Sequence, residues 1–373
     1  ISMQFNSIIM AMAGAERIFK LMDEVPEKDE GTVTLVNVTE TDGKIAECDH
    51  VTGSWAWKVY KEGSTEPTYI PQKGDLVMED VDFGYTDEKI VLHDVTMVAE
   101  AGQKIADVVW DTTFTVTKGL EYYQMQVLTE TYEKIDMYLL RVDQSQGLDI
   151  RAATSGNANP PTWVRQVPSE MAAHMDSPEK PVYALVNADF CENRLPIRPR
   201  GPHHADGKII VSSYSIDPKL PQQALSFVGV TYEGKMVIAP NVEYQDTKKS
   251  LKECTGAGVI LLMNSEIQGG YVTDPARDPR TAIGYTSDNI VWILAVDGRH
   301  KGTEGMTYME MAEIFRALGC QAAVNLDGGG STQMLVRDPQ TDEIEMRNWP
   351  SDPTAGFGGR ERPRLNGWVI MKR

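Results

Sequence analysis

Alternating apolar and polar residues predict β-strands in much of the chain after residue 106. Such alternation places successive side chains on opposite faces of a sheet. A continuous apolar run that ends in polar residues predicts one further, buried strand. The alternating segments are 117–128, 133–143 and 148–154, and the apolar run is 182–190. A short helix is expected at residues 169–175, with Ser169 as its N-cap.

The first hundred residues have a different pattern. Residues 4–22 carry apolar side chains at helical spacing, which predicts a helix that is too polar to span a membrane. Residues 31–73 show little periodicity, and no element is assigned to them. Residues 74–106 contain two alternating runs around a turn at Tyr85 to Glu88, which predicts a pair of antiparallel strands.

The segment from Arg280 to Val296 predicts a β-hairpin. Residues 280–286 and 290–296 are strand-like, and Ser-Asp-Asn between them is a turn signal centred near Asp288. With this turn, Arg280 lies across from the end of the second strand, beside Asp297.

A helix and a third strand follow the hairpin. Thr307 and Glu310 have the spacing of a capping box, an apolar face follows them, and Gly319 suits a helix C-terminus. Residues 320–326 are a short apolar strand. Strand, crossover helix and strand form a βαβ unit, in which the two strands are normally parallel.

Aspartates follow both strands of this unit. Asp297 and Asp327 should therefore project from the carboxyl ends of neighbouring or near-neighbouring strands, where open α/β sheets bind ligands. Asn187 and Asp189 follow another apolar strand and are candidates for the same ligand site.

Three consecutive glycines come directly after Asp327 and precede Ser331. They are Gly328, Gly329 and Gly330. Glycines permit positive φ and let backbone N–H groups face an anion. A glycine triplet alone more often makes only a tight turn, Asp297 alone is more often a turn residue, and Arg280 alone is more often on the surface. Their coincidence favours an anion site.

Length and charge limit the possible domain organisation and the possible ligands. The 373 residues suit a large domain preceded by a small one, with the boundary near residues 106 and 107. The fold class expected is α+β, a mixed β-sheet domain with a βαβ unit and flanking helices after a small helix-plus-strands segment. A net charge of −18 argues against nucleic acid as a partner, so an anionic substrate needs a local arginine cluster.

Several residues carry weaker signals. Two arginine sets in loops are by default solvated, and a phosphate or glycan rim is the alternative. These are Arg194, Arg198, Arg200, Arg360, Arg362 and Arg364. The adjacent His203 and His204 are weak evidence for a metal, and no spacing demands a divalent cation or other cofactor. Four cysteines without a CxxC pair allow one disulfide or none.

The motifs of the second region resemble those of the phosphodiester glycosidase family of N-acetylglucosamine-1-phosphodiester alpha-N-acetylglucosaminidase. They are RTAIG from Arg280, DG at Asp297, the MEMAE helix and NLDGGGS from Asn325 to Ser331, with weaker matches at VNADF and ERPRLNG. The resemblance spans roughly residues 115–373. The family's asparagine-led motif usually has glycine at the position of Asp189.

This resemblance implies hydrolysis of the bond between a sugar's anomeric carbon and a phosphodiester, in a bacterial glycan or exopolysaccharide. Asp297 and Asp327 would be the two carboxylates, and Arg280 with the glycine amides would hold the phosphate. Residues expected to bind substrate are Asn187, Asp189, Arg299, Asn325, Gly328, Gly329, Gly330 and Ser331. The alternative is a glycan- or phosphate-binding module without catalysis. The family usually works outside the cytoplasm, although the chain shows no export signal.

Residues 1–106 resemble part of an ABC transporter exporter: the tail of its last transmembrane helix and the opening strands of its nucleotide-binding domain. Tyr85 stands where that family stacks an aromatic on adenine. After Ile105 and Ala106, however, the chain reads DVVWDTT and lacks GxxxxGK[ST], which argues against ATP binding. The segment is therefore interpreted as a truncated remnant.

Overall fold

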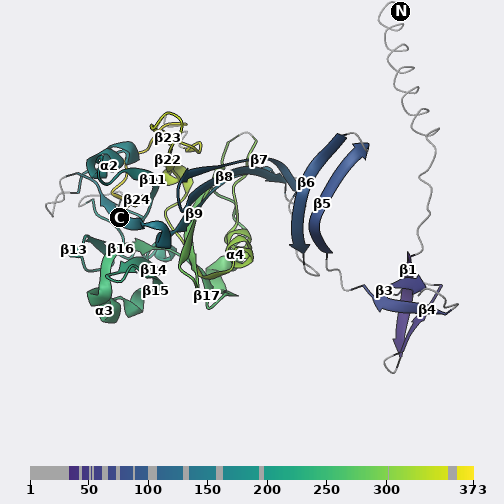
Figure 1. Ribbon diagram of the computed structural model, residues 1–373. Coiled ribbons are helices and arrows are strands. Elements are labelled where there is room, and N and C mark those ends of the chain that lie inside the picture. Colours follow the sequence, from purple (N-terminus) through teal and green to yellow (C-terminus); the bar gives the residue numbers. More distant parts are fainter. Residues whose placement is uncertain are drawn as a thin grey trace, which may run out of the picture. The chain divides into compact units, whose positions relative to one another are not determined.

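The computed structural model describes residues 33–41, 44–49, 52, 54–60, 66–72, 76–86, 89–99, 107–128, 134–156, 163–192, 197–300, 302–351 and 359–373 (Figure 1). The chain divides into two compact units, Ile1–Ile105 and Ala106–Arg373, which are described separately. The helix predicted at residues 4–22 lies outside the described residues.

Unit 1 contains two antiparallel sheets. Its elements are β1 (Val33–Thr41), β2 (Lys44–Glu47), β3 (Trp55–Tyr60), β4 (Pro67–Pro71), β5 (Leu76–Thr86) and β6 (Lys89–Ala99). The first four strands pair in the order β2-β1-β3-β4, in a region where the sequence predicted no element. β5 and β6 form the predicted antiparallel pair, in which Thr86 is opposite Lys89.

Unit 2 is built mainly of β-strands. Its first strands are β7 (Asp107–Thr117), β8 (Leu120–Leu128), β9 (Lys134–Asp143), β10 (Leu148–Thr154), β11 (Val182–Asn187), β12 (His203–Ala205), β13 (Lys208–Val211), β14 (Ser226–Thr231) and β15 (Met236–Pro240). They are followed by β16 (Leu251–Ala257), β17 (Ile260–Met263), β18 (Glu266–Ile267), β19 (Arg280–Thr286), β20 (Ile290–Val296), β21 (Cys320–Asn325), β22 (Met334–Arg337), β23 (Ile344–Met346) and β24 (Asn366–Lys372). The α-helices are α2 (Pro168–Met175), α3 (Tyr244–Thr247) and α4 (Tyr308–Ala317).

These strands form one large sheet and two smaller ones. The large sheet has the order β18-β17-β21-β19-β20-β9-β8-β7, and the five-stranded sheets have the orders β10-β24-β11-β22-β23 and β13-β12-β16-β14-β15. Three of the predicted strands are confirmed as β8, β9 and β10, and the buried apolar run is confirmed as β11. The α+β class holds broadly, although helices are fewer than expected.

Period-2 alternation gives the large sheet two apolar faces. Ile283 and Ile293 face each other across the hairpin and belong to a core shared with strands of the two smaller sheets. The adjacent pair, Ala282 and Leu294, points to the opposite face and belongs to a second core. Helix α4 covers this second face (Figure 1). The Phe315 side chain of this helix is fully buried in the second core. Side chains of both faces are therefore buried, which explains the nearly continuous apolar runs of β20 and β21.

The hairpin and crossover form as the sequence predicts. β19 and β20 pair antiparallel with Arg280 opposite Val296, and the Ser-Asp-Asn turn contains Asn289 with a φ of 66°. The capping box of α4 is present, because Thr307 accepts from the amide of Glu310 while the Glu310 carboxylate accepts from the amide of Thr307. β19 lies between β20 and β21 and is antiparallel to both, so those two strands are parallel and end at the same sheet edge.

One predicted cap is wrong. α2 begins at Pro168 with Val167 as the N-cap residue, and no side chain caps it. Proline at the first helical position fixes φ and needs no hydrogen-bond partner for its nitrogen, so the helix starts before Ser169. The amide of Ser169 instead donates to the Glu361 carboxylate at 2.7 Å.

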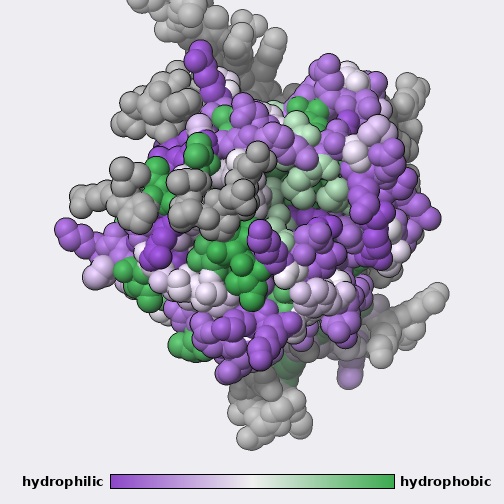
Figure 2. All heavy atoms as spheres, turned by 90° about the vertical axis from the view of Figure 1, so that its left-hand side faces the viewer, coloured by the Kyte–Doolittle hydropathy of each residue, from purple (hydrophilic) through white to green (hydrophobic). Residues whose placement is uncertain are grey.

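The face of the molecule shown in Figure 2 is largely hydrophilic, with hydrophobic side chains in separate patches. Among the described residues, no helix has the length and apolar content needed to cross a bilayer. All four cysteines are free thiols, so of the two alternatives for them the structure has no disulfide.

Candidate functional site

A cavity of about 380 Å³ lies where the loops after β11, β20 and β21 meet the C-terminal segment. Its charged lining consists of five arginines and two aspartates: Arg200, Arg280, Arg299, Arg362, Arg364, Asp278 and Asp327. The glycine loop, defined as Gly328 to Ser331, forms another part of the wall. The local excess of arginine contrasts with the net charge of −18 for the whole chain. This cavity is the local cationic cluster that an anionic ligand requires.

The glycine loop has a backbone that side chains would obstruct. Gly329 has a φ of 61°, and a Cβ added to Gly328 would lie 2.6 Å from the carbonyl oxygen of Pro279. The amide of Gly329 donates to that same carbonyl at 2.8 Å. The amides of Gly328 and Gly330 donate to no acceptor among the described residues. Two unused N–H groups at a cavity wall are suited to an anion.

Arg280 lies at the first position of β19 and lines the cavity. Its Nε donates to the carbonyl of Met306 at 3.0 Å, and one terminal nitrogen donates to the carbonyl of Ala276 at 2.9 Å. The guanidinium carbon lies 4.0 Å from the centroid of the Tyr308 ring. These contacts fix the side chain of a residue that is only 6% exposed. A cation held in this way can bind an anion without further ordering.

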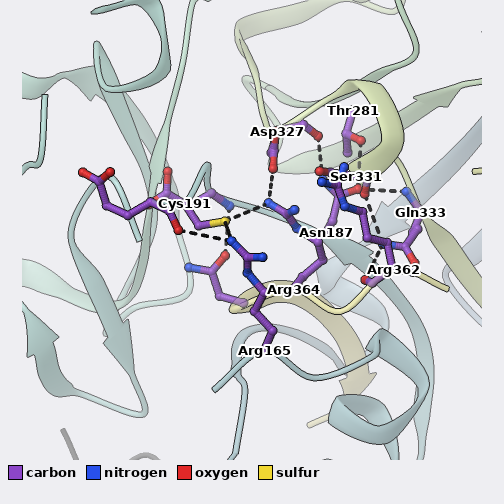
Figure 3. A network of polar contacts seen from close by, with 12 residues as sticks. Arg165, Asn187, Cys191, Thr281, Asp327, Ser331, Gln333, Arg362 and Arg364 are labelled. Atoms are coloured by element: carbon purple, nitrogen blue, oxygen red, sulfur yellow. Dashed lines mark hydrogen bonds and ion pairs between the residues drawn. The ribbon is translucent and has the colours of Figure 1, made fainter. Parts of the chain in front are cut away.

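Asp327 follows β21 and also lines the cavity. Its carboxylate forms an ion pair with Arg364, whose side chain reaches it from the segment before β24 (Figure 3). The same guanidinium lies 3.4 Å from the Cys191 sulfur. The Asp327 side chain is 14% exposed. It is therefore a largely desolvated carboxylate at the cavity wall with one cationic partner.

Asp297 does not share this cavity, and the predicted pair of converging carboxylates is wrong in this respect. Its carboxylate accepts hydrogen bonds from the Tyr138 hydroxyl (2.9 Å), the Asn348 amide group (2.9 Å) and the backbone amide of Trp349 (2.8 Å). The residue is 2% exposed, and burial raises the pKa of its carboxyl group. These hydrogen bonds connect the end of β20 to β9 and to the loop after β23, so Asp297 stabilises the packing of these segments.

Asn187 and Asp189 lie beside the cavity but do not line it, which corrects their expected contact with substrate. Asn187 is fully buried and donates to the carbonyl of Asp327 at 2.6 Å, while its own side-chain oxygen accepts from Thr281 and from the amide of Gln333 (Figure 3). Asp189 accepts from the amide of Gly201 at 2.7 Å, and burial raises the pKa of its carboxyl group well above the usual value. Both residues hold backbone around the site.

Arg299 and Asn325 line the cavity, as do Gly328, Gly329, Gly330 and Ser331. Arg299 has a φ of 60° and an ion pair with Asp278, with 2.7 Å between its terminal nitrogen and the carboxylate. Asp278 was not among the residues that the sequence indicated. It lies in an irregular loop without a motif, and only its place two residues before Arg280 could have indicated it.

The loop arginines divide between the two alternatives considered for them. Arg200, Arg362 and Arg364 line the cavity, whereas Arg194 lies outside the described residues and Arg198 and Arg360 do not contribute to the lining. His203 is fully buried, and burial lowers its pKa to about 3. Among the described residues, no group of three or more His, Cys, Asp or Glu side chains is placed to hold a metal ion.

Comparison with known proteins assigns this geometry to a class. Residues 180–371, just over half of the chain, match the model of the phosphodiester glycosidase family. The chain therefore belongs to the phosphodiester glycosidase family. The matched residues include the cavity-lining parts of β19, β21 and the glycine loop.

Two solved structures share the fold. The catalytic domain of zebrafish N-acetylglucosamine-1-phosphodiester alpha-N-acetylglucosaminidase, auto-inhibited by its pro-peptide, is similar at 16% identity with a TM-score of 0.51, over 71% of this chain and 88% of that one. A protein of Burkholderia pseudomallei K96243 is similar at 13% identity with a TM-score of 0.50, over 74% and 98%. At these identities the likeness concerns the fold.

A curated relative is the SPbeta prophage-derived uncharacterized protein YomE of Bacillus subtilis (strain 168). It is 34% identical over 100 residues, which cover 26% of this chain and 16% of that protein. Nothing in these comparisons supports the resemblance of residues 1–106 to an ABC exporter, or an exopolysaccharide as the substrate. That assignment of residues 1–106 stays a prediction, and the side chain of Tyr85 lies outside the described ones.

Proposed function

We propose that the cavity binds a sugar-1-phosphodiester and that the protein hydrolyses the bond between the anomeric carbon and the phosphate oxygen. The products are a free sugar and a phosphomonoester. The observation that carries the proposal is that Asp327, Arg280 and the glycine loop line one cavity. Membership of the phosphodiester glycosidase family supports the same reaction class.

The phosphate group belongs beside Arg280 and the glycine loop. Arg280 is held by two carbonyls, and the unused amides of Gly328 and Gly330 add neutral donors. Together they stabilise the negative charge that the departing phosphomonoester gains as the glycosidic bond breaks. Because a phosphomonoester is a good leaving group, charge stabilisation matters more here than proton donation to the leaving oxygen.

Asp327 is the carboxylate that acts on the sugar. It lines the cavity and forms an ion pair with Arg364, and a carboxylate in this position can serve as a nucleophile at the anomeric carbon or as a base for the attacking water. Asp278 is the other carboxylate in the lining, and its ion pair with Arg299 indicates a role in positioning arginines. The two-carboxylate scheme with Asp297 is replaced by one carboxylate and a cationic wall.

Turnover of a defined substrate tests this proposal. The methyl phosphodiester of N-acetylglucosamine 1-phosphate is a suitable probe, because the similar zebrafish protein is named for this sugar. We expect free N-acetylglucosamine and methyl phosphate, with oxygen-18 from labelled water in the sugar. Label in the phosphate would contradict glycosidic cleavage. Binding without turnover by the wild-type protein would instead favour a module that binds glycans or phosphate.

A further inference from the structure

The cavity also has an uncharged wall whose polar groups lack partners. Three carboxamide side chains line it, those of Gln222, Gln223 and Asn325, together with the ring of Phe190. None of the three carboxamides forms a hydrogen bond with a described residue, and Asn325 Oδ1 is buried without a partner. Polar atoms in such positions are normally satisfied. A ligand that supplies both donors and acceptors would satisfy these.

A glycine brings the members of this wall together. The amide of Gly258 donates to the backbone carbonyl of Asn325 at 2.9 Å. A Cβ on Gly258 would lie 2.9 Å from the carbonyl oxygen of Gln222 and 3.0 Å from Cε2 of Phe190. Only a residue without a side chain allows this approach. Gln222, Gln223, Asn325 and Phe190 therefore form one surface, which we call the carboxamide wall.

The loop that carries the two glutamines is anchored. The short 3-10 helix at Pro221–Gln223 begins with a proline, and the carbonyl of Ala224 accepts from the Asn241 side chain at 2.7 Å. The carboxamides are thus presented on a fixed backbone. A carboxamide offers both donors and an acceptor, so it can pair with the hydroxyl and amide groups of a ligand.

We propose that the carboxamide wall is the sugar subsite, and that it selects a neutral pyranose through hydrogen bonds to its hydroxyl or N-acetyl groups. This inference rests on the proposed function, in which the arginines and the glycine loop hold the phosphate. The chemical basis is that the cavity lining contains three uncharged carboxamides in addition to its five guanidinium groups. A sugar that lacks a recognised hydroxyl leaves a buried carboxamide unpaired and is rejected.

Calorimetric binding separates the two halves of the cavity. The probes are the methyl phosphodiester of N-acetylglucosamine 1-phosphate, which has both groups, and dimethyl phosphate, which has no sugar. We expect the wild-type protein to bind the sugar-bearing probe more tightly. The double variant Gln222→Ala/Gln223→Ala and the single variant Asn325→Ala should each weaken that binding by about 2- to 12-fold per lost carboxamide, with dimethyl phosphate binding unchanged.

Gln340→Ala is the matched control, because Gln340 is exposed and outside the cavity lining. Thermal unfolding checks that each variant is folded, and the glutamine double variant remains informative if Asn325→Ala does not fold. The proposal is overturned if the wild type binds both probes equally, or if the variants keep the full preference for the sugar. Turnover is measured separately, so a sugar preference without hydrolysis would overturn the proposed function and leave the carboxamide wall standing.

Discussion

The ends of β20 and β21 carry the same sequence signal and have different surroundings. Each strand is apolar, each ends at the same sheet edge, and each is followed by an aspartate and a glycine. Asp297 receives hydrogen bonds from three donors and does not line the cavity. Asp327 has one cationic partner and lines the cavity. The number of internal donors thus separates a structural carboxylate from one that can act on a ligand.

The two aspartates should therefore fail in different ways when substituted. Asp327→Asn keeps the shape but removes the negative charge at the cavity wall. We expect kcat for the sugar phosphodiester to fall by about 10²- to 10⁴-fold, as for loss of a group that transfers a proton or attacks substrate. Initial rates at saturating substrate measure this effect.

Asp149→Asn is the control for charge removal, because Asp149 pairs with Arg373 away from the cavity. It should leave kcat unchanged. Full activity in Asp327→Asn would remove Asp327 from the mechanism and break the distinction between the two strand ends.

Asp297→Asn should instead lower stability. The new amide group replaces one acceptor oxygen and faces the donors of Asn348 and Trp349. An unsatisfied buried donor costs about 1–3 kcal/mol in the free energy of unfolding. Chemical denaturation measures the cost, and kcat at a temperature where the variant is folded should stay near the wild-type value. A large loss of kcat in the folded variant would return Asp297 to the site.

The elements of this region could be predicted because their determinants are local. The Ser-Asp-Asn turn fixes the hairpin register, and the capping box from Thr307 to Glu310 fixes the start of α4. The predicted N-cap at Ser169 was wrong because the neighbouring Pro168 is the first residue of the helix.

The surroundings of the two aspartates could not be predicted, because they come from distant segments. Tyr138 is 159 positions from Asp297 in the sequence, and Asn348 is 51 positions away. Arg364 approaches Asp327 from 37 positions further along the chain. A single sequence contains no signal for these contacts. The motif therefore indicated the sheet edge at which the cavity lies and one of the two aspartates that line it.

Asp189 extends the comparison to pH, because it is a buried carboxyl group whose Oδ2 accepts from the Gly201 amide and whose Oδ1 has no partner. Burial raises its pKa in the folded protein, so its protonated form is favoured there. Its contribution to stability is complete below the pKa of the unfolded chain and is lost as pH rises through the raised folded pKa. Asparagine does not ionise, so Asp189→Asn removes this pH-dependent loss of stability. Relative to the wild type, the variant should therefore gain stability as pH rises above the pKa of the unfolded carboxyl group.

Asp143→Asn is the control of opposite sign. A hydrogen bond from Ser145 lowers the pKa of Asp143, so its stabilisation is present at neutral pH and lost as pH falls through the lowered folded value. Denaturation curves at several pH values should give opposite slopes for the two variants relative to wild type. Equal slopes would contradict the role of burial at Asp189.

Substitution of the α4 cap should give the smallest of the expected effects. It should lower stability without changing activity. α4 connects the strand that ends at Asp297 to the strand that ends at Asp327, and its capping box lies outside the cavity lining. Thr307→Ala removes a side chain that accepts from the amide of Glu310, at a cost of about 1 kcal/mol in the free energy of unfolding. Thr307→Ser keeps the acceptor and should restore most of that stability. Because the βαβ connection fixes both strand ends through packing rather than through this cap, kcat and substrate affinity should match the wild type in both variants. A fall in kcat for Thr307→Ala alone would mean that the start of α4 also positions Tyr308 and Arg280, and that the structural and catalytic ends of the crossover are coupled.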